Sequence, residues 1–303
     1  MVISLGSINM DLVVRCERMP AQGETITSNG WFSNPGGKGA NQAVQAARMG
    51  SRSMLVGRIG SDAFGREVMS SLSASGVDIS GVVADPALPT GIACVLVEHS
   101  GENRIIVAPG ANGAVGATEL RILRNVLQPG AVLLLQCEIP FGVVLEAARM
   151  GHVAGATVIL DPSPWESVTI GPGVFADVDY LVPNESEARA LSGTDDMREA
   201  AAVLLGLGAR TIIVKMGGKG AFAVGVFGIG EVPAFSVVPV DTTAAGDAFQ
   251  GAFASSLERG VSPDNALNIA MAAGALTVTR PGAQQSMPDG AEVAAFIEAR
   301  KRF

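Results

Sequence analysis

Short apolar runs alternate with amphipathic stretches along most of the chain. The apolar runs, which predict strands, lie at residues 2–5, 53–56, 131–135, 157–160, 180–182 and 211–214. The amphipathic stretches, which predict helices, lie at residues 40–48, 64–75, 142–149, 185–191 and 198–207. Strands that alternate with helices form right-handed crossovers around a parallel sheet. We therefore expect an α/β fold, with a doubly wound, mainly parallel sheet and helices on both faces.

Two regions break this alternation. Residues 12–15 with 24–32, and residues 91–97 with 103–107, are pairs of β-like runs that have no helix between them. Such hairpin-like strands do not fit easily into a parallel core, so we expect them to form a small separate sheet. An antiparallel extension at the edge of the main sheet is the alternative.

Composition agrees with this fold class. Hydrophobic residues make up 48% of the 303 residues and aromatic residues 5%, which favours the Ala-, Val-, Leu- and Ile-rich core of a doubly wound sheet. The length allows one large α/β domain or two small ones. The formal net charge of −8 argues against a nucleic acid or an anionic membrane as a partner.

The cysteines and the N-terminal residues bear on location. Cys16, Cys94 and Cys137 are widely spaced and form no CxxC pair, as is typical of reduced, structural thiols in the cytosol. The strand predicted at residues 2–5 leaves no room for a signal peptide, and no apolar run approaches the ~18–20 residues that a membrane span needs. We therefore expect a cytoplasmic protein.

The sequence Asp-Thr-Thr-Ala-Ala-Gly-Asp at 241–247 runs directly into an apolar helical pattern. Small residues before a helix let backbone N–H groups converge at its N-terminus, where the peptide dipoles favour an anion. Asp247 would lie beside the bound anion as a potential base, an arrangement that suits transfer of a phosphoryl group to a hydroxyl. The alternative is that Asp247 only stabilises the first turn of its own helix.

Polar residues also follow the predicted strands, at the edge where open α/β sheets bind ligands. Asn9 and Asp11 come after residues 2–5, and their side chains could bind neighbouring hydroxyls of a polyol. Glu138 comes after residues 131–135, so it lies either at the rim of a ligand cleft or in a salt bridge. The Gly-Gly-Lys-Gly sequence at 36–39 is no P-loop, because Gly39 stands where a Ser or Thr is needed.

Two further motifs follow strands in the second half of the chain. Glu185 and Glu187 would lie in the first turn of a helix after residues 180–182, and helix capping explains these acids by itself. The sequence Lys-Met-Gly-Gly-Lys-Gly at 215–220 follows residues 211–214 and is consistent with a nucleotide-side loop. Its spacing is not that of the dinucleotide-binding fingerprint.

Three motifs together resemble the PfkB family of carbohydrate kinases, and within it the ribokinase branch. They are Gly-Ser-Ile-Asn-Met-Asp at 6–11, Gly-Gly-Lys-Gly-Ala-Asn-Gln-Ala at 36–43 and the motif at 241–247. The resemblance continues to residues 279–283. The family often has Gly where this chain has Ala244, but a methyl group there leaves the N–H groups free.

The resemblance implies an ATP-dependent kinase that phosphorylates the primary hydroxyl of D-ribose to give D-ribose 5-phosphate and ADP. It makes Asp247 the base and assigns the anion hole to the N–H groups of Ala244, Ala245, Gly246 and Asp247. The sugar hydroxyls are assigned to Asn9, Asp11, Gly37, Lys38, Asn41, Glu138 and Asp247.

The resemblance also implies three cofactors, ATP, Mg²⁺ and an activating K⁺. The nucleotide and its Mg²⁺ are assigned to Asn184, Glu187, Lys215, Gly217, Gly218, Lys219, Gly220 and Gly246. The monovalent cation is assigned to Asp241, Thr243, Thr277, Arg280, Gly282 and Ser286, with Arg280 acting through its carbonyl. Oxygen ligands of these kinds suit a hard cation.

One domain over residues 1–303 is expected, in which the small sheet, at about 11–33 and 91–108, is a lid over the sugar. The resemblance implies that this lid is also the surface of a homodimer. Deoxyribose, another sugar or a nucleoside is the alternative substrate. A sugar-binding regulator without turnover is a second alternative, and a nucleotide-dependent dehydrogenase, which the missing fingerprint disfavours, is a third.

Overall fold

The computed structural model describes residues 1–99, 103–165, 170–225, 228 and 230–300. Within these residues the main sheet has nine strands in the order β13-β12-β11-β10-β9-β8-β1-β4-β5. In that order they are Glu231–Val232, Ala221–Gly225, Thr211–Lys215, Tyr180–Leu181, Thr157–Asp161, Val132–Gln136, Val2–Leu5, Ser53–Gly60 and Asp78–Asp85. Every pairing from β5 to β11 is parallel, and β12 and β13 are antiparallel.

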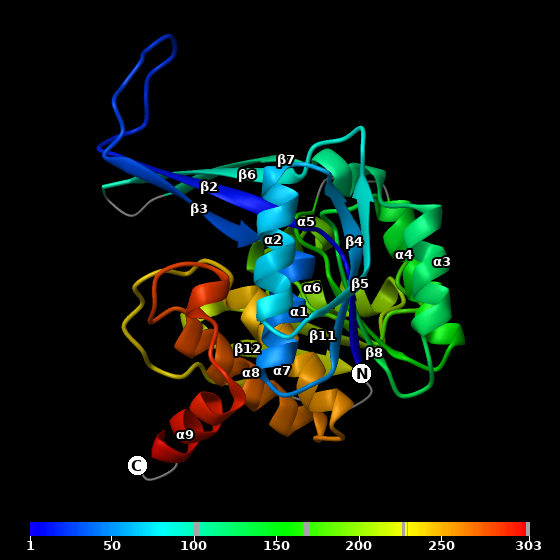
Figure 1. Ribbon diagram of the computed structural model, residues 1–303. Helices are drawn as coiled ribbons and strands as arrows, with labels where there is room; N and C mark the ends of the chain where they lie inside the picture. The colour runs from blue at the N-terminus through cyan, green and yellow to red at the C-terminus, as the bar shows by residue number, and fades with distance from the viewer. Residues whose placement is uncertain (100–102, 166–169, 226–227, 229, 301–303) are drawn as a thin grey trace.

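Helices cover both faces of this sheet (Figure 1). They are α1 Lys38–Arg48, α2 Ala63–Ala74, α3 Ala117–Val126, α4 Phe141–Val153, α5 Glu185–Ser192, α6 Met197–Gly206, α7 Ala245–Glu258, α8 Pro263–Thr277 and α9 Gly290–Arg300. Alternate strand residues pack on opposite faces, as the period of two requires. Leu133 and Leu135 of β8 pack with α3 to α6, whereas Val132 and Leu134 pack with α7 and α8. The predicted doubly wound α/β fold is confirmed.

A second, four-stranded sheet lies across one end of the main sheet (Figure 1). Its order is β3-β2-β6-β7, with β2 Asn9–Cys16, β3 Gly30–Gly36, β6 Gly91–Glu98 and β7 Asn103–Ala108. The β2–β3 and β6–β7 pairings are antiparallel, and β2 pairs with β6 in parallel. The predicted small separate sheet is therefore confirmed, and the main sheet is not extended at its edge by these strands.

The strand predicted over residues 24–32 is wrong for residues 24–29. The ladder with β2 begins only at Gly30, which pairs with Arg15. The carboxylate of Glu24 instead accepts hydrogen bonds from the Arg18 guanidinium and, at 2.8 Å, from the N–H of Ala21. These hydrogen bonds hold Glu24 in a local turn instead of a strand. The β2–β3 connection projects beyond the sheet (Figure 1). The strand β5 and the helix α3 were not predicted.

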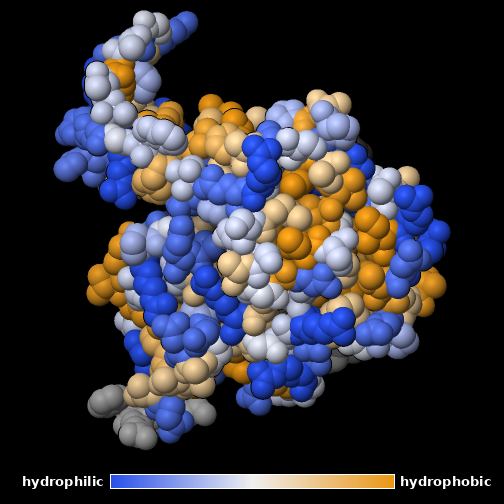
Figure 2. All heavy atoms as spheres, viewed as in Figure 1, coloured by the Kyte–Doolittle hydropathy of each residue, from blue (hydrophilic) through white to orange (hydrophobic). Residues whose placement is uncertain are grey.

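The small sheet exposes apolar side chains. Trp31 is 68% and Ile106 is 69% exposed, and the surface over this sheet includes hydrophobic patches (Figure 2). Leu12 pairs with Cys94 and Val14 with Leu96, so these four side chains share one face. In the described part of the chain, no helix is both long and apolar enough to cross a membrane.

Candidate active site

The helix α7 begins without a side-chain cap. Its N-cap, Ala244, has φ 58° and is the one non-glycine residue with positive φ among the described residues. A methyl group accepts no hydrogen bond, so the N–H groups of the first turn remain available to a ligand. The aligned peptide dipoles add positive potential at this end. The start of α7 therefore has the geometry of an anion-binding helix N-terminus. The left-handed φ also explains why glycine suits the position of Ala244.

Asp247 is buried in the first turn of α7 and is held by two amides of α1. Nδ2 of Asn41 lies 2.9 Å from its Oδ2, and Nε2 of Gln42 lies 3.2 Å from its Oδ1. Burial raises the pKa of Asp247, while the charge of Lys38 acts in the opposite direction. A buried carboxylate of raised basicity is suited to accept a proton from a hydroxyl.

Close backbone contacts place the start of α1 against the connection between β1 and β2. Gly37 has φ 90°, and a Cβ there would lie 2.7 Å from the backbone N of Asn9. A Cβ on Gly39 would lie 2.6 Å from the carbonyl carbon of Gly6. Only glycine allows this approach, which brings Lys38 and Asn41 to the side chains that follow β1.

The sugar-side residues predicted from the sequence gather around Lys38. Oε2 of Glu138 accepts hydrogen bonds from Oγ of Ser7 at 2.5 Å and from the N–H of Lys38 at 3.3 Å. Burial acts to lower the pKa of Lys38, but Asp247 and three further carboxylates outweigh it and raise that pKa. The pKa of Asp11 rises to about 7 because of burial and then of Glu138 and Asp247. This cluster offers several acceptors and one strong donor to neighbouring hydroxyls.

Asn9 is oriented by a partner from another part of the chain. Its Oδ1 accepts a hydrogen bond from Nδ2 of Asn112 at 2.7 Å, and Asn112 also binds the N–H of Ile8 at 2.9 Å. With its oxygen so used, Asn9 presents its NH₂ group as a donor.

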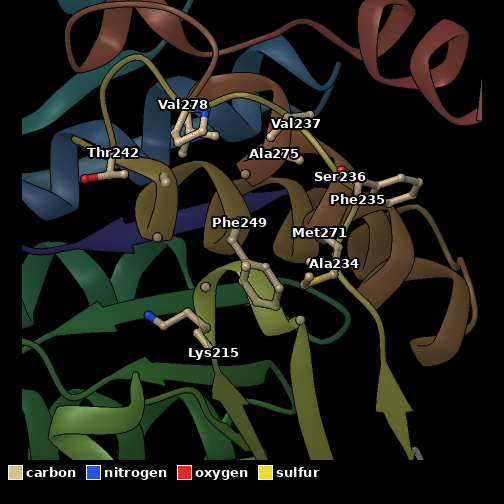
Figure 3. Close-up of a pocket in the computed structure, with 17 residues that line it drawn as sticks. Lys215, Ala234, Phe235, Ser236, Val237, Thr242, Phe249, Met271, Ala275 and Val278 are labelled. Carbon is tan, nitrogen blue, oxygen red and sulfur yellow. The ribbon is translucent and has the colours of Figure 1, made fainter.

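A cavity of about 510 Å³ lies on the other side of the start of α7. Figure 3 shows Phe249 and Met271 in its wall and Lys215 at the end of β11. Gly217, Gly218, Gly220 and Gly246 also line it. Apolar walls suit a planar base, and the helix N-terminus with Lys215 suits phosphates.

Three of the predicted nucleotide residues are engaged locally. Asn184 and Glu187 form the capping box of α5, so the capping alternative is realised in the structure. Both carboxylate oxygens of Glu187 accept from Asn184, at 2.8 and 2.9 Å. Lys219 is absent from the cavity lining, and its ammonium lies 3.0 Å from Glu185.

The two segments predicted to hold a cation are joined by Asp241. Its Oδ1 accepts from the N–H of Thr243 and its Oδ2 from that of Gly282, each at 2.9 Å. Burial acts to raise the pKa of Asp241, but hydrogen bonds from the Thr243 side chain and from the N–H groups of Gly282 and Thr243 outweigh it and lower that pKa. The hydroxyl of Thr277 donates to the carbonyl of Ala273 at 2.9 Å, and that of Ser286 to the carbonyl of Ala283 at 2.7 Å.

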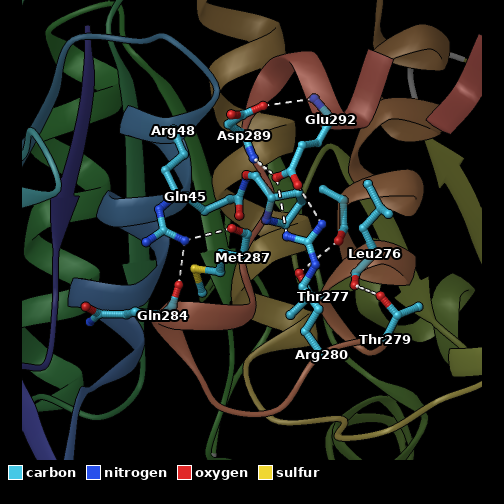
Figure 4. A network of polar contacts seen from close by, with 12 residues as sticks. Gln45, Arg48, Leu276, Thr277, Thr279, Arg280, Gln284, Met287, Asp289 and Glu292 are labelled. Carbon is cyan, nitrogen blue, oxygen red and sulfur yellow. Dashed lines mark hydrogen bonds and ion pairs between the residues drawn. The ribbon is translucent and has the colours of Figure 1, made fainter. Parts of the chain in front are cut away.

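Ion pairs and hydrogen bonds hold the later of these segments in place (Figure 4). Arg48 of α1 donates to the carbonyls of Gln284 and Met287, at 2.6 and 2.7 Å. The guanidinium of Arg280 lies 2.6 Å from Glu292. The side chain of Arg280 is therefore used in an ion pair, which leaves its carbonyl as the group that could face a cation.

A second cavity, of about 740 Å³, lies between the small sheet and these loops. Asp11 and Arg15 line it from the small sheet, and Asp241, Thr243 and Gly282 line it from the loops. The small sheet therefore covers a space that opens onto the sugar-side cluster through Asp11.

Several polar residues of the site were missed by sequence reasoning. They are Ser7, Gln42, Asn112, Gln136, Asp161 and Gln284. Gln136 and Asp161 end β8 and β9, so the rule that selected Glu138, a polar residue at the carboxyl end of a strand, could have found both. Gln42 stands in the 36–43 motif, next to a residue that was assigned.

Comparisons with known proteins agree over nearly the whole chain. The pfkB family carbohydrate kinase model matches residues 1–290. The ribokinase of Schizosaccharomyces pombe is 36% identical over 315 aligned residues, which cover 99% of this chain and 98% of the relative. A deoxyribokinase of Salmonella typhi is 33% identical over 94% of each chain. The solved structure of Arabidopsis thaliana ribokinase complexed with ribose and ATP has a TM-score of 0.86 at 34% identity, over 98% of each chain.

Proposed function

The chain belongs to the pfkB family of carbohydrate kinases, and from that premise we propose that it transfers the γ-phosphoryl group of ATP to the primary hydroxyl of D-ribose. The products are D-ribose 5-phosphate and ADP. One observation carries the proposal: the buried Asp247 lies at a helix N-terminus, bonded to Asn41 on the sugar side, while Gly246 of the same turn lines the nucleotide-side cavity.

The sugar hydroxyls bind to the polar cluster around Lys38. The residues assigned to them are Asn9, Asp11, Gly37, Lys38, Asn41 and Glu138. Asp247 accepts the proton of the primary hydroxyl as its oxygen attacks the γ-phosphorus. Because Asn41 and Gln42 already hold both oxygens of Asp247, little reorganisation is needed when the hydroxyl arrives.

The transferred group lies at the start of α7, where the N–H groups of residues 244–247 stabilise its charge. Lys215, Gly217, Gly218 and Gly220 contact the nucleotide. Lys219 joins them by leaving Glu185, which costs little because an exposed ion pair contributes about 0–1 kcal/mol.

Two cations complete the proposal. Mg²⁺, when bound, would neutralise the charge of the phosphates. Asn184 and Glu187 would hold it through water, and the buried position of the Glu187 carboxylate supports that role. K⁺ is assigned to Asp241, Thr243, Thr277, Arg280, Gly282 and Ser286. The hydrogen bonds of Asp241 to both segments support this donor set.

K⁺, when bound, would steady the backbone that precedes α7 and would not itself contact the substrate. We expect turnover to rise severalfold when K⁺ is added at constant ionic strength, more than with Na⁺. Asp241→Ala abolishes this response. A flat response to K⁺ contradicts the assignment.

The small sheet acts as a lid and as a homodimer surface in a cytoplasmic enzyme. The exposed apolar side chains of Trp31 and Ile106 support the pairing of two lids. Light scattering at micromolar concentration is expected to give a dimer mass, and a fully active monomer contradicts this part of the proposal.

The function is tested by measuring the release of ADP in a coupled assay, with pentoses, hexoses and nucleosides as the candidate acceptors. D-ribose is expected to give the highest kcat/KM. Deoxyribose is the second candidate, favoured by the 33% identity to a deoxyribokinase. Binding of ribose without any ADP release identifies a sugar-binding regulator instead, and no response to any acceptor contradicts the kinase assignment.

A further inference from the structure

Gln42 contacts Asp247 but lines neither cavity. It is fully buried in α1, and its Nε2 lies 3.2 Å from Oδ1 of Asp247 and 3.4 Å from Oδ2 of Asp161. An amide NH₂ group carries two hydrogens. Gln42 can therefore donate one hydrogen to each carboxylate at the same time.

The orientation of the Gln42 amide is set by Gln136. Nε2 of Gln136, also fully buried, lies 2.7 Å from Oε1 of Gln42. Because a donor occupies the oxygen of Gln42, its NH₂ group must face the two carboxylates. If the Gln42 amide were reversed, its oxygen would face the two carboxylates and its NH₂ group would face the NH₂ group of Gln136, so neither would find a partner.

The two carboxylates that Gln42 bridges belong to different sides of the site. Asp247 is bonded to Asn41 on the sugar side. Asp161 forms an ion pair at 3.0 Å with Lys215, which lines the nucleotide-side cavity. Nζ of Lys215 lies 3.6 Å from the point where a Cβ on Gly246 would stand, beside the first turn of α7. Gln42 thus connects, through hydrogen bonds, the carboxylate on the sugar side with the one on the nucleotide side.

We propose that Gln42, oriented by Gln136, is a positioning residue that separates the carboxylates of Asp247 and Asp161 and aims Asp247 at the attacking hydroxyl. This inference rests on the proposed function, in which Asp247 is the base. Two carboxylates that lacked the bridging donor would repel each other, and Asp247 would rotate away from its productive direction. A small misplacement of a reacting group can lower the rate by about 10²-fold.

The test is Gln42→Met, which keeps the side-chain volume and removes both donors. We expect kcat to fall by about 10- to 100-fold, while the KM values for ribose and ATP change little. Gln136→Met frees the amide of Gln42 and should lower kcat less. The double variant should be no slower than Gln42→Met, because residues that act through one another are not additive.

Gln45→Met is the matched control. Gln45 is also fully buried in α1, and its Nε2 binds the carbonyl of Pro288 at 3.0 Å, away from Asp247. Its loss should lower Tm about as much as Gln42→Met and leave kcat unchanged. If Gln42→Met and Gln45→Met lower kcat equally, or if the two Gln effects at 42 and 136 multiply in the double variant, the positioning role is overturned.

Asp247→Asn, measured in parallel, separates this inference from the function. If Asp247→Asn is inactive and Gln42→Met turns over normally, the inference alone fails. If Asp247→Asn keeps its turnover, the assignment of the base fails.

Discussion

The sugar side and the nucleotide side of the site are formed by different types of residue. The sugar side consists of charged and amide side chains, such as Asp11, Lys38 and Asn41, most of them bonded to further polar residues. On the nucleotide side, Lys215 is the one charged residue among the described residues that line the cavity, and the rest are glycines, apolar residues and the hydroxyl residues Ser236 and Thr242. The first side recognises its ligand through directed hydrogen bonds. The second recognises it through shape, a helix N-terminus and backbone N–H groups.

The difference has a consequence for selectivity. A hydroxyl that is missing from the sugar leaves a buried charged group unpaired, which costs more than a lost apolar contact. Replacing one side chain of the nucleotide cavity leaves its backbone groups in place. We therefore expect the enzyme to be stricter about its sugar than about its nucleotide, and the substitutions below test that expectation.

The largest effect is expected at the boundary between the two sides. Asp247→Asn keeps the size of the side chain but removes the base, so kcat should fall by about 10²–10⁴-fold. Folding and ribose binding should survive, since the amide can still bond to Asn41. Circular dichroism and calorimetry with ribose check both points. Turnover within a few-fold of the parent would rule out general-base catalysis by Asp247.

A substitution on each side tests the comparison directly. Asp11→Ala should raise the KM for ribose, because a hydrogen bond to a charged group contributes roughly 1.5–3 kcal/mol, or about 10- to 150-fold. The KM for ATP should barely move. Ser236→Ala, in the nucleotide cavity, should leave both KM values nearly unchanged. Equal changes in the two KM values of Asp11→Ala would mean that Asp11 supports the fold rather than the sugar.

The pKa of Asp11 adds a pH dependence to the sugar side alone. Burial, Glu138 and Asp247 raise this pKa from 3.8 to about 7, so a falling pH protonates Asp11 and removes its charge as an acceptor. The KM for ribose should therefore rise by about tenfold between pH 8 and pH 6. Asp11→Asn should show no such rise. If the KM of the parent is flat over this range, Asp11 is already ionised at pH 6.

The same shift has an opposite effect on stability. The folded state holds the proton of Asp11 more tightly than the unfolded chain does, between the unfolded pKa of 3.8 and the folded value of about 7. The contribution of Asp11 to the free energy of unfolding therefore falls as pH rises through this window. Denaturant titrations of the parent and of Asp11→Asn measure that contribution by difference.

The smallest effect is expected at Ala244. Its left-handed backbone, with φ 58°, costs an alanine roughly 1–2 kcal/mol, part of which is offset because glycine loses more entropy on folding. Ala244→Gly should therefore raise the free energy of unfolding by about 1 kcal/mol or less, with kcat little changed. A loss of stability would show that the Ala244 methyl packs usefully against its neighbours.

Sequence reasoning predicted those site residues whose position depends only on their neighbours in the same segment. Asp11 and Glu138 follow buried strands, and Asp247 opens a helix after small residues, so each could be placed by its own segment. The hydrogen bond between Gln42 and Gln136 could not be predicted, because an amide inside a helix and one at the end of a strand become partners only when α1 packs against β8. The parallel pairing of β2 with β6 was missed for a similar reason, since it depends on how the chain crosses between them.

The side chain of Lys219 shows another limit of sequence reasoning. Its place in a glycine-rich turn at the end of β11 predicts that it faces the phosphates. In the structure its ammonium lies 3.0 Å from Glu185, so contact with the phosphates requires the side chain to leave this ion pair. In a tight turn, neighbouring positions point their side chains in different directions. The pattern of residue types does not show which direction a given position takes.

The position of β1 also has a consequence for synthesis on the ribosome. β1 lies between β4 and β8 in the main sheet. The sugar-side residues that follow β1 in the chain contact Asp247, which belongs to the much later helix α7. A growing chain carries Asn9, Asp11 and Asn41 long before it carries residue 247. Until α7 has been synthesised, the sugar-binding residues have no base beside them, so phosphoryl transfer from ATP to ribose must wait for α7.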